Sequence, residues 1–446
     1  MLTLQGYRIP KAGLEKEHHI KGLLTVKPYI PSVFVKPQYV SRFEVFRECS
    51  NFLYVPKHFG IERFGAIKET QRDVPQTDAK YWEFAGQIRD SQKPVVNSFL
   101  LPEPHDGILS LQTGGGKTVC GLYIASQLRL PTLVLVHSGF LKDQWVERIQ
   151  AFLPNARIGT IQGEVFDIEN KDIVVGMLQT IALKDHPPNH FKRFGLIIVD
   201  ECHHIASEGF SQAVPKLTSK YMLGLSATPE RKDKLMYVIH WFLGPLLYVS
   251  NKADKMDELV NVEVYEFEGD EKHNEIIYNN SGVMFTTLMI NKMTENVERT
   301  KFLVKILEDI AEEPERQILV LSDRVEHTKN LYDLLNSSLQ SKAGILARGM
   351  KPAVRDEFCK NKKILISTYQ LVKEGFDVPT LNTLVMATSR PDIDQIVGRI
   401  LRVEKSKRTT HPLIIDVVDV PFRRQFQERL NLYKQRNYKV EKMKLE

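Results

Sequence analysis

Two segments far apart in the chain carry residue types that bind phosphate. One is Leu111-Gln-Thr-Gly-Gly-Gly-Lys-Thr118, and the other is Gln395-Ile-Val-Gly-Arg-Ile-Leu-Arg402. Glycines followed by Lys-Thr can cradle phosphates, and two arginines one helical turn apart can reach a γ-phosphate from the opposite side. Because each segment is expected in its own domain, the ATP site would be complete only when two domains close.

The glycine segment predicts a phosphate-binding loop at the start of a helix. Its backbone N–H groups can approach phosphate oxygens, and the helix N-terminus adds a favourable dipole. Lys117 would neutralise the β- and γ-phosphates, and the Thr118 hydroxyl would ligate Mg²⁺. Leu111 stands where the strict pattern has another glycine, so a simple glycine-rich turn after a strand is the alternative. The phosphate-binding residues expected here are Gly114, Gly115, Gly116, Lys117 and Thr118.

A carboxylate pair follows the apolar residues of the run Leu196-Ile-Ile-Val-Asp-Glu-Cys-His203. Asp200 can hold Mg²⁺, and Glu201 can accept a proton from an attacking water. An acidic pair at a strand end is often only a solvated terminus, but behind a glycine loop it predicts an ATPase. Adjacent strand residues point to opposite faces, so His203 and His204 are expected to have coupling or core roles rather than to share a metal.

Two further segments are informative only together with the glycine loop and the acidic pair. Arg399 and Arg402 are predicted on one face of a helix, with Gln395 one turn earlier. Alone, that pattern fits a surface helix whose arginines pair with acids equally well. The run Ser226-Ala-Thr-Pro229 follows a predicted strand, and its position after the acidic pair favours a role in the same site.

The composition limits the class of protein. With 446 residues, 42% hydrophobic and 26% charged, the chain has the balance of a globular enzyme of two or three domains. Its net charge of +6 is compatible with a polyanionic partner. Four scattered cysteines form no C-x-x-C pair, which argues against zinc, an iron–sulfur cluster or disulfides and suits a reducing compartment. Without a signal core or an apolar run of about 18 residues, the chain is expected inside the cell and not across a membrane.

Short apolar strands alternate with helices along most of the chain, which predicts parallel sheets covered on both faces. In the first half the expected strands and helices are Gly107–Leu111, Lys117–Leu128, Thr132–His137, Leu141–Phe152, Ile173–Met177, Leu196–Asp200 and Met222–Ser226. In the second half they are Gln317–Ser322, Asn330–Ser338, Val354–Asn361, Ile364–Ser367, Thr383–Met386, Asp394–Leu401 and Leu413–Val417. The fold class expected is therefore α/β, with two parallel-sheet domains in tandem.

Three parts lie outside these series. Residues 1 to about 80 are interrupted by prolines and predict a small module of α+β or β-rich type. The polar segment Asn251–Glu298 is expected to hold the hinge and an irregular start to the second domain. The last stretch, Pro421–Glu446, is rich in basic residues such as Arg429. It predicts an amphipathic helix packed on the second domain with a solvated basic face, and a nucleic-acid arm is the alternative.

In their order and spacing, these motifs resemble those of the superfamily 2 helicases and translocases. The resemblance covers residues from about 85 to 420. It implies two RecA-like domains, with an accessory module at 1–80, an ATP-binding domain at 81–252 and a second helicase domain at 253–446.

The resemblance also implies roles for individual residues. Gln92 would read the adenine, and Asp377, within Glu374-Gly-Phe-Asp-Val-Pro379, would reach the ribose. The catalytic set would be Lys117, Asp200, Glu201 and the arginine fingers Arg399 and Arg402, with Thr118 and Asp200 on Mg²⁺. Coupling to domain movement would involve His203, Ser226, Thr228 and Gln395. The nucleic-acid backbone would be gripped by His137, Ser138, Gln179, Thr180, Ser367 and Thr368.

Within the superfamily, the Asp-Glu-Cys-His box and the run Gly224-Leu-Ser-Ala-Thr-Pro-Glu-Arg-Lys-Asp233 are most similar to the duplex-DNA translocases. These include the transcription-factor-H subunit, the T4-type phage recombination helicase and the poxvirus transcript-release helicase. Arg231-Lys-Asp233 resembles the Arg-Glu-Asp element of the first, with lysine in place of glutamate. Tyr54-Val-Pro-Lys-His-Phe-Gly60 resembles the start of helicases from large cytoplasmic DNA viruses.

The activity expected from this resemblance is that of an ATP- and Mg²⁺-dependent DNA helicase or translocase with little sequence preference and a monomeric working core. Partners in viral transcription, such as transcript release, or in DNA repair or recombination are implied. The expected location is a cytoplasmic viral factory, the virion or the nucleus. Two alternatives stay open: a DExH-type RNA helicase, and a non-hydrolysing scaffold that binds nucleic acid.

Overall fold

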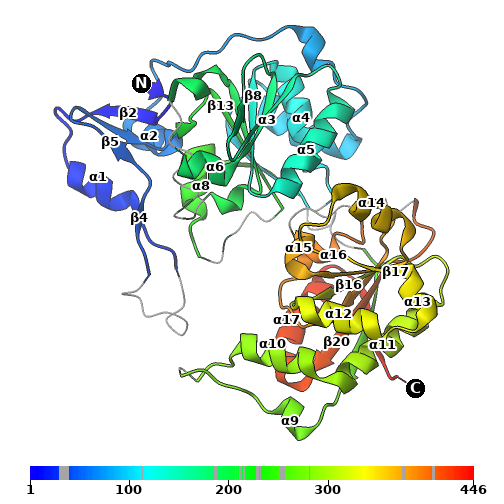
Figure 1. The fold of residues 1–446 in the computed structure, drawn as a ribbon. Helices are drawn as coiled ribbons and strands as arrows, with labels where there is room; N and C mark the ends of the chain where they lie inside the picture. Colours follow the sequence, from blue (N-terminus) through cyan, green and yellow to red (C-terminus); the bar gives the residue numbers. More distant parts are fainter. Residues whose placement is uncertain are drawn as a thin grey trace. The chain divides into compact units, whose positions relative to one another are not determined.

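The computed structural model describes residues 1–445 except 30–39, 113, 185–187, 206, 208, 210–212, 214–215, 228–230, 232, 251–256, 281, 374–377 and 404–406. The chain divides into two compact units, Met1–Ser250 and Asn251–Glu446 (Figure 1). Thr228, Asp377 and residues 251–256 of the expected hinge lie outside the described residues. No helix in the part that the structure describes combines the length and apolar character that crossing a membrane requires.

The amino-terminal unit begins with a small α+β module. Its antiparallel sheet has the order β1-β2-β6-β5, from Leu2–Thr3 (β1), Gly6–Pro10 (β2), Phe52–Val55 (β6) and Arg47–Glu48 (β5). The other elements are β3 (Thr25–Val26), which pairs with β4 (Phe43–Glu44), and the helices α1 (Glu17–Leu23) and α2 (Lys57–Phe64). Pro56 precedes α2 and Gly65, with a φ of 91°, ends it. The module is of the α+β type that its sequence predicts.

Buried charges fix this module to the larger sheet of the same unit. Asp106 accepts from Lys57 Nζ and His58 Nε2 of α2, each at 2.7 Å, and from the Met222 backbone N at 3.0 Å. Arg72 is 1% exposed and donates to the carbonyls of Thr218, Lys192, Phe191 and Phe194. Because buried polar groups are costly unless paired, the module and the sheet stabilise each other.

Replacing Asp106 by asparagine is expected to lower the free energy of unfolding by about 3–5 kcal/mol, the usual loss when one partner of a buried ion pair is removed. Burial alone would raise the pKa of Asp106, but the charges of Lys57 and His58 outweigh it and hold the pKa below its ordinary value. The carboxyl is therefore ionised in the fold, and an amide would leave Lys57 without its counter-charge. The measurement is the unfolding midpoint in guanidinium chloride.

The matched control for this change is Asp73→Asn, which removes the exposed partner of Lys220. Exposed ion pairs contribute little to stability, so the control should hardly move the midpoint. Equal losses in the two variants would show that the Asp106 contacts do not hold the module in place.

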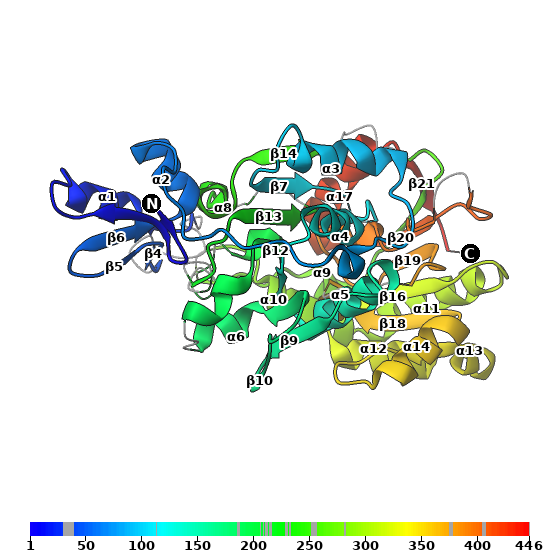
Figure 2. The ribbon, with the colours of Figure 1, turned by 90° about the horizontal axis from the view of Figure 1, so that it is seen from above.

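The main sheet of the amino-terminal unit carries the predicted motifs of that unit, and Figure 2 shows its strands β14, β7, β13 and β12 side by side. Its described strands have the order β10-β9-β11-β8-β12-β13-β7-β14, parallel except between β10 and β9. The strands are Gly107–Ser110 (β7), Thr132–Val136 (β8), Ile158–Gln162 (β9), Val165–Asp167 (β10), Ile173–Met177 (β11), Leu196–Asp200 (β12), Tyr221–Ser226 (β13) and Leu246–Val249 (β14). The helices are Lys93–Leu100 (α3), Lys117–Leu128 (α4), Gly139–Phe152 (α5), Leu178–Leu183 (α6) and Met236–Leu243 (α8). Because carboxyl ends of parallel strands meet at one edge, the segments after β7, β8, β11 and β12 are neighbours.

Both faces of this sheet are covered, which explains why its strands are unbroken apolar runs. On β8, Val134 and Val136 lie in the core that α3, α4 and α5 cover, whereas Leu133 and Leu135 lie in the core with α6 and α8. The amino-terminal module shares the second core, through residues such as Phe59. A sheet packed on both faces is the arrangement that the apolar strands predict.

The carboxy-terminal unit has a parallel sheet with the order β17-β18-β16-β19-β20-β15-β21 in its described residues. The strands are Asn261–Phe267 (β15), Ile318–Ser322 (β16), Ala343–Ile345 (β17), Ile364–Thr368 (β18), Thr383–Met386 (β19), Leu413–Asp419 (β20) and Lys439–Met443 (β21). The helices are Glu271–Asn274 (α9), Thr286–Glu295 (α10), Val297–Ala311 (α11), Val325–Leu334 (α12), Ser337–Lys342 (α13), Pro352–Asn361 (α14), Tyr369–Lys373 (α15), Asp394–Val397 (α16) and Arg423–Gln435 (α17). One core contains α11, α12 and α13, and the other contains α15, α16 and α17.

Three predictions for this unit are wrong in detail. The segment Asn251–Glu298 is irregular only in part, because it contains the strand β15, which pairs along its length with β20 and over Asn261–Tyr265 with β21. The helix expected at Asn330–Ser338 is two helices, because the Asn336 side chain caps α13 and accepts from its backbone at 3.0 Å. The stretch Pro421–Glu446 contains the predicted amphipathic helix, α17, with exposed Arg423 and Arg424, but the strand β21 follows it and Arg429 is buried rather than solvated.

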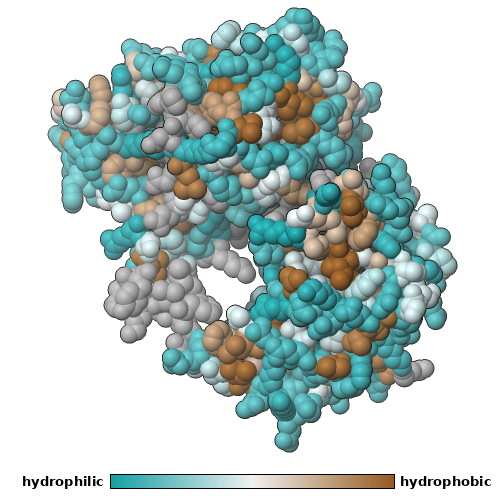
Figure 3. Space-filling model, in the orientation of Figure 1, coloured by the Kyte–Doolittle hydropathy of each residue, from teal (hydrophilic) through white to brown (hydrophobic). Residues whose placement is uncertain are grey.

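The surface in the view of Figure 3 is mostly hydrophilic, with apolar side chains in small groups. One group lies over α10 and the segment before it, where Tyr278, Phe285 and Leu288 are exposed. Scattered apolar groups of this kind are ordinary on a globular enzyme.

Candidate nucleotide and nucleic-acid site

The glycine loop between β7 and α4 has the backbone shape that phosphate binding needs. Gly114 and Gly116 have φ values of 85° and 82°, which favour glycine. A Cβ on Gly116 would lie 2.1 Å from Gln92 Nε2, so this position also lacks room for a side chain. Helix α4 then begins at Lys117 and runs for 12 residues. The loop and the helix N-terminus can therefore direct backbone N–H groups at an anion.

Gln92 supports this loop from the segment before α3. Its Oε1 accepts from Arg89 N at 2.9 Å, and its Nε2 donates to the Gly115 carbonyl at 3.2 Å. Arg89 Nη2 also donates to the Gly114 carbonyl, at 3.4 Å. The structure thus places Gln92 beside the phosphate loop, and its contact with an adenine stays a prediction.

The carboxylate pair lies where β12 ends, next to the lysine of the loop. Lys117 Nζ and Glu201 Oε1 are 2.6 Å apart. Asp200 is 7% exposed, and each of its oxygens has a donor: Oδ1 accepts from Glu201 N at 3.0 Å, and Oδ2 accepts from Trp145 Nε1 at 2.9 Å. Glu201 has a φ of 47°, so the strand ends there and the chain turns. The glycine loop and the acidic pair therefore form one site.

The pKa values of the two carboxyl groups of this site shift in opposite directions. Burial, followed by the neighbouring Glu201 carboxylate, raises the pKa of Asp200. Burial also acts to raise the pKa of Glu201, but the Lys117 ammonium and His203 outweigh it, and this pKa falls well below its ordinary value. The donors that hydrogen-bond to Asp200 are uncharged. A buried carboxylate with uncharged donors, in a site that also has the Thr118 hydroxyl, fits Mg²⁺, which prefers oxygen ligands.

The histidines after this pair are not on a strand, so the expectation that they point to opposite faces is wrong. Residues Cys202–His204 form a 3-10 turn, because the left-handed backbone of Glu201 ends β12 before them. His203 Nδ1 lies 3.3 Å from both Ser226 Oγ and Glu201 Oε2. The structure therefore brings His203 and Ser226, two residues expected to couple hydrolysis to movement, against the acidic pair.

Three histidine rings lie next to one another, tilted by 36° and 39°, and the last belongs to His137, a candidate nucleic-acid residue. The His203 and His204 ring centroids are 4.3 Å apart, and those of His204 and His137 are 4.2 Å apart. Burial, with the neighbouring His203 and His137, lowers the pKa of His204 to about 3. His204 is therefore neutral near pH 7 and acts as a packed ring between the two segments.

Two segments expected to grip nucleic acid meet at this edge of the sheet. Gln179 Nε2 donates to the His137 carbonyl at 2.6 Å, which joins the ends of the neighbouring strands β11 and β8. The Ser138 hydroxyl caps α5 by accepting from the first turn at 3.3 Å, and Thr180 Oγ1 accepts from Gly163 N at 3.1 Å. The structure assembles these residues, and their contact with nucleic acid stays a prediction.

The carboxy-terminal unit holds its candidate residues at the end of β18 and near α16. Ser367 is buried and donates to the Leu346 carbonyl at 3.3 Å, whereas Thr368 is half-buried and accepts from the backbone of α15 at 3.4 Å. Gln395 lies within α16 and is half-buried. Residues 374–377, which include the candidate ribose contact, lie outside the described residues.

Arg399 and Arg402 lie beyond the helix predicted to carry them. Helix α16 spans only Asp394–Val397, and the backbone then changes to three-residue spacing, as between Arg399 N and the Ile396 carbonyl at 2.9 Å. The prediction that both arginines share one helix face is therefore wrong. Gly398 is a weak helix former at the point where the helix ends, which accounts for the early stop.

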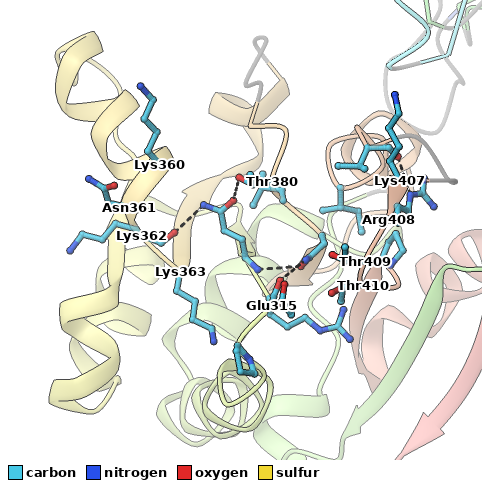
Figure 4. Close-up of a pocket in the computed structure, with 18 residues that line it drawn as sticks. Glu315, Lys360, Asn361, Lys362, Lys363, Thr380, Lys407, Arg408, Thr409 and Thr410 are labelled. Carbon is cyan, nitrogen blue, oxygen red and sulfur yellow. Dashed lines mark hydrogen bonds between the residues drawn. The ribbon is translucent and has the colours of Figure 1, made fainter.

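A hollow of about 490 Å³ lies in the carboxy-terminal unit at the other end of its parallel sheet, at the residues that precede β16, β18, β19 and β20 (Figure 4). Several lysines line it, but Lys362 Nζ donates to the Ser341 carbonyl and Lys363 Nζ to the Glu313 carbonyl. In the close-up the Lys362 side chain points away from the other labelled residues. The hollow contains none of the residues expected to bind ATP or nucleic acid.

Some contacts of this site could not be expected from the motifs. The bond from Trp145 to Asp200 was not expected, because a tryptophan on the buried face of a helix predicts only core packing. The tilted ring contact of His137 with His204 joins residues far apart in the chain. Arg89 has a local signal, since it lies three residues before Gln92, but nothing in its type predicts a contact with the glycine loop.

The chain is similar to known proteins over most of its length. A protein-family model described as "Type III restriction enzyme, res subunit" matches residues 85–231. The chain is 31% identical over 458 residues to L396 of Acanthamoeba polyphaga mimivirus, named as a candidate ATP-dependent RNA helicase, with 99% of this chain and 86% of that protein covered. It is 27% identical over 388 residues to 161L of Invertebrate iridescent virus 6, named as a candidate helicase, with 80% and 84% covered.

A solved structure supports the fold. Dbp5 of S. cerevisiae, bound to RNA and ADP BeF3, matches with a TM-score of 0.57 at 16% identity and covers 80% of this chain and 90% of that one. The predicted α/β fold class with two RecA-like domains is confirmed. With its identity to L396 across nearly the whole chain, this protein belongs to the superfamily 2 helicases of large DNA viruses, a family of nucleic-acid-dependent ATPases.

Proposed function

We propose that this chain is an ATP- and Mg²⁺-dependent helicase or translocase that acts on DNA. The observation that carries the proposal is the 2.6 Å contact of Lys117 with Glu201, beside the buried Asp200 and a glycine loop of suitable backbone shape. A module that only binds nucleic acid has no physical need for this set. The choice of DNA rests on the similarity of the run Gly224–Asp233 to the duplex-DNA translocases.

In this proposal the amino-terminal unit supplies most of the ATP site. Lys117 binds the β- and γ-phosphates, and Glu201 accepts a proton from the attacking water. Thr118 and Asp200 hold Mg²⁺, which supplies positive charge to the reacting phosphates. The Lys117–Glu201 pair must separate for both groups to act, so ATP binding itself prepares the base.

Other residues complete the site or connect it to movement. Arg399 and Arg402 are proposed to bring cations to the γ-phosphate, and Gln92 and Asp377 to contact the adenine and the ribose. His203, Ser226, Thr228 and Gln395 are proposed to couple hydrolysis to domain movement, a role that the contacts of His203 with Ser226 and Glu201 support.

Nucleic acid is proposed to lie along His137, Ser138, Gln179 and Thr180 in one unit and Ser367 and Thr368 in the other. Hydroxyl and amide groups of these types can bind phosphate oxygens, and contacts to phosphates carry no sequence information, which would give little sequence preference.

ATP turnover is expected to rise most with DNA when duplex DNA, single-stranded DNA and RNA are compared at matched salt. The Lys117→Ala variant should lose this stimulated turnover, because the phosphates lose their lysine. Full stimulated turnover in Lys117→Ala would sink the proposal. Stronger stimulation by RNA would favour the alternative of an RNA helicase, which the name of the mimivirus relative supports. A negligible rate with every nucleic acid at saturation would favour the non-hydrolysing scaffold.

We further propose that the working core is a monomer that serves viral transcript release, DNA repair or recombination. The cytoplasmic viral factory, the virion or the nucleus is the proposed site of action. The mimivirus and iridescent virus relatives support a viral setting.

A further inference from the structure

We propose that Trp145 is a positioning residue that orients Asp200 and links it to nucleic-acid binding at the start of α5. This inference rests on the proposed function, because it gives Asp200 the role of a magnesium ligand. It adds a residue outside the motifs and a physical route from the nucleic acid to the metal.

The contact is buried and directional. Trp145 is 0% exposed, and its Nε1 donates to Asp200 Oδ2 at 2.9 Å. The other oxygen, Oδ1, accepts from Glu201 N at 3.0 Å. With one donor on each oxygen, rotation of the carboxylate plane is restricted, so its free lone pairs have a set direction.

The chemistry of an indole suits this task. The indole N–H can donate one hydrogen bond, accepts none and carries no formal charge. It can therefore orient Asp200 without neutralising it, whereas an ammonium in the same place would compete with a cation. Groups that orient a metal ligand typically affect metal affinity or activity about 10–100-fold when they are removed.

The indole also lies against the helix that carries the phosphate-binding lysine. A Cβ on Gly121 of α4 would lie 3.3 Å from Trp145 Cη2, so the glycine gives the ring room to pack there. Trp145 therefore contacts both β12, which ends in Asp200, and α4, which begins at Lys117.

Helix α5 connects this contact to the candidate nucleic-acid residues. His137 and Ser138 lie at its start, and Trp145 follows about two helical turns later. Leu141, Trp145 and Ile149 are buried at four-residue spacing, so Trp145 lies on the same packed face as the first turn of α5. A nucleic acid that shifts or steadies the start of α5 therefore acts on the Trp145 hydrogen bond, which depends steeply on geometry.

The test compares Trp145→Phe with Trp82→Phe. Phenylalanine keeps an aromatic ring but loses the N–H donor. Trp82 is a matched control in the same unit, because it is buried and its Nε1 donates to Thr77 Oγ1 at 2.6 Å, away from the acidic pair. Melting temperature is measured while MgCl2 is titrated into protein with a fixed concentration of ADP, and the fold-stimulation of ATP turnover by nucleic acid is measured in parallel.

In Trp145→Phe, the Mg²⁺ concentration for half-maximal stabilisation is expected to rise about tenfold or more, and the stimulation by nucleic acid to fall by a similar factor. Trp82→Phe should stay within about twofold of the wild type in both. A Trp145→Phe half-point within about twofold of the wild type overturns the proposal, as does an equal shift in Trp82→Phe.

Two outcomes need separate treatment. If Trp145→Phe does not fold, benzothienylalanine at position 145 keeps the ring size and replaces the N–H by sulfur. A Mg²⁺ concentration for half-maximal stabilisation equal to that of the wild type then overturns the proposal, and a tenfold shift supports it. If the wild type itself shows no Mg²⁺-dependent stabilisation with ADP, the proposed role of Asp200 fails, and the inference fails with it. The wild-type curve thus separates the two failures.

Discussion

Replacement of Glu201 by glutamine is expected to lower nucleic-acid-stimulated ATP turnover at least about a hundredfold, the range over which a general base contributes. Glu201 is held 2.6 Å from Lys117, and its pKa lies well below the ordinary value, so the carboxylate is ionised at neutral pH. Glutamine has nearly the same size but cannot accept the proton. The measurement is the steady-state rate with saturating ATP and nucleic acid.

The same variant should still bind nucleotide, because the amide no longer holds the Lys117 ammonium by charge. Binding of a fluorescent ATP analogue to Glu201→Gln is therefore expected to be as tight as to the wild type or tighter. Glu147→Gln is the control, since Glu147 is exposed on α5 and the change of charge is identical. Turnover in Glu201→Gln above about a tenth of the wild-type rate would show that another group accepts the proton.

Replacement of Arg429 by methionine is expected to lower the free energy of unfolding of the carboxy-terminal unit by about 3–5 kcal/mol. Arg429 is 0% exposed and forms two hydrogen bonds to Asp416, at 2.8 and 2.7 Å, and one to Ser389 Oγ at 2.8 Å. Methionine fills similar space but leaves the Asp416 carboxylate buried without its cation. The unfolding midpoint in guanidinium chloride, followed by circular dichroism, measures the loss.

Arg424→Met is the matched control for this change. Arg424 lies on the same helix, five residues earlier in the chain, and is exposed. Removal of an exposed charge should change the midpoint little. If Arg429→Met is as stable as Arg424→Met, the buried pair does not hold α17 on the sheet.

The strands and helices near the ATP motifs could be predicted closely because their signals are local. The observed β11, β12, β19 and α4 have the bounds that the sequence predicts. Each is a mostly apolar run, and local signals such as Gly116 before α4 and Asp200 at the end of β12 help to define its bounds.

The parts that could not be predicted depend on distant partners. Strand β15 alternates apolar and acidic residues and becomes a strand because β20 and β21 pair with it. Arg429 belongs to a basic stretch, and only Asp416 on β20 explains why it is buried. The candidate site also depends on distant partners. The motifs indicate Lys117 and Glu201, but the side chain that donates to Asp200 is Trp145 of α5, and the sequence of that helix predicts only packing.

The 2.6 Å contact of Lys117 with Glu201 has a consequence for when ATP can be hydrolysed. While this contact is formed, the base is not offered to water and the lysine is not offered to an anion of lower charge. A ligand must be negative enough to draw the lysine away before the glutamate is released. The enzyme would then hydrolyse nothing until a triphosphate binds. The selectivity for a triphosphate would begin with the Lys117–Glu201 contact within the protein.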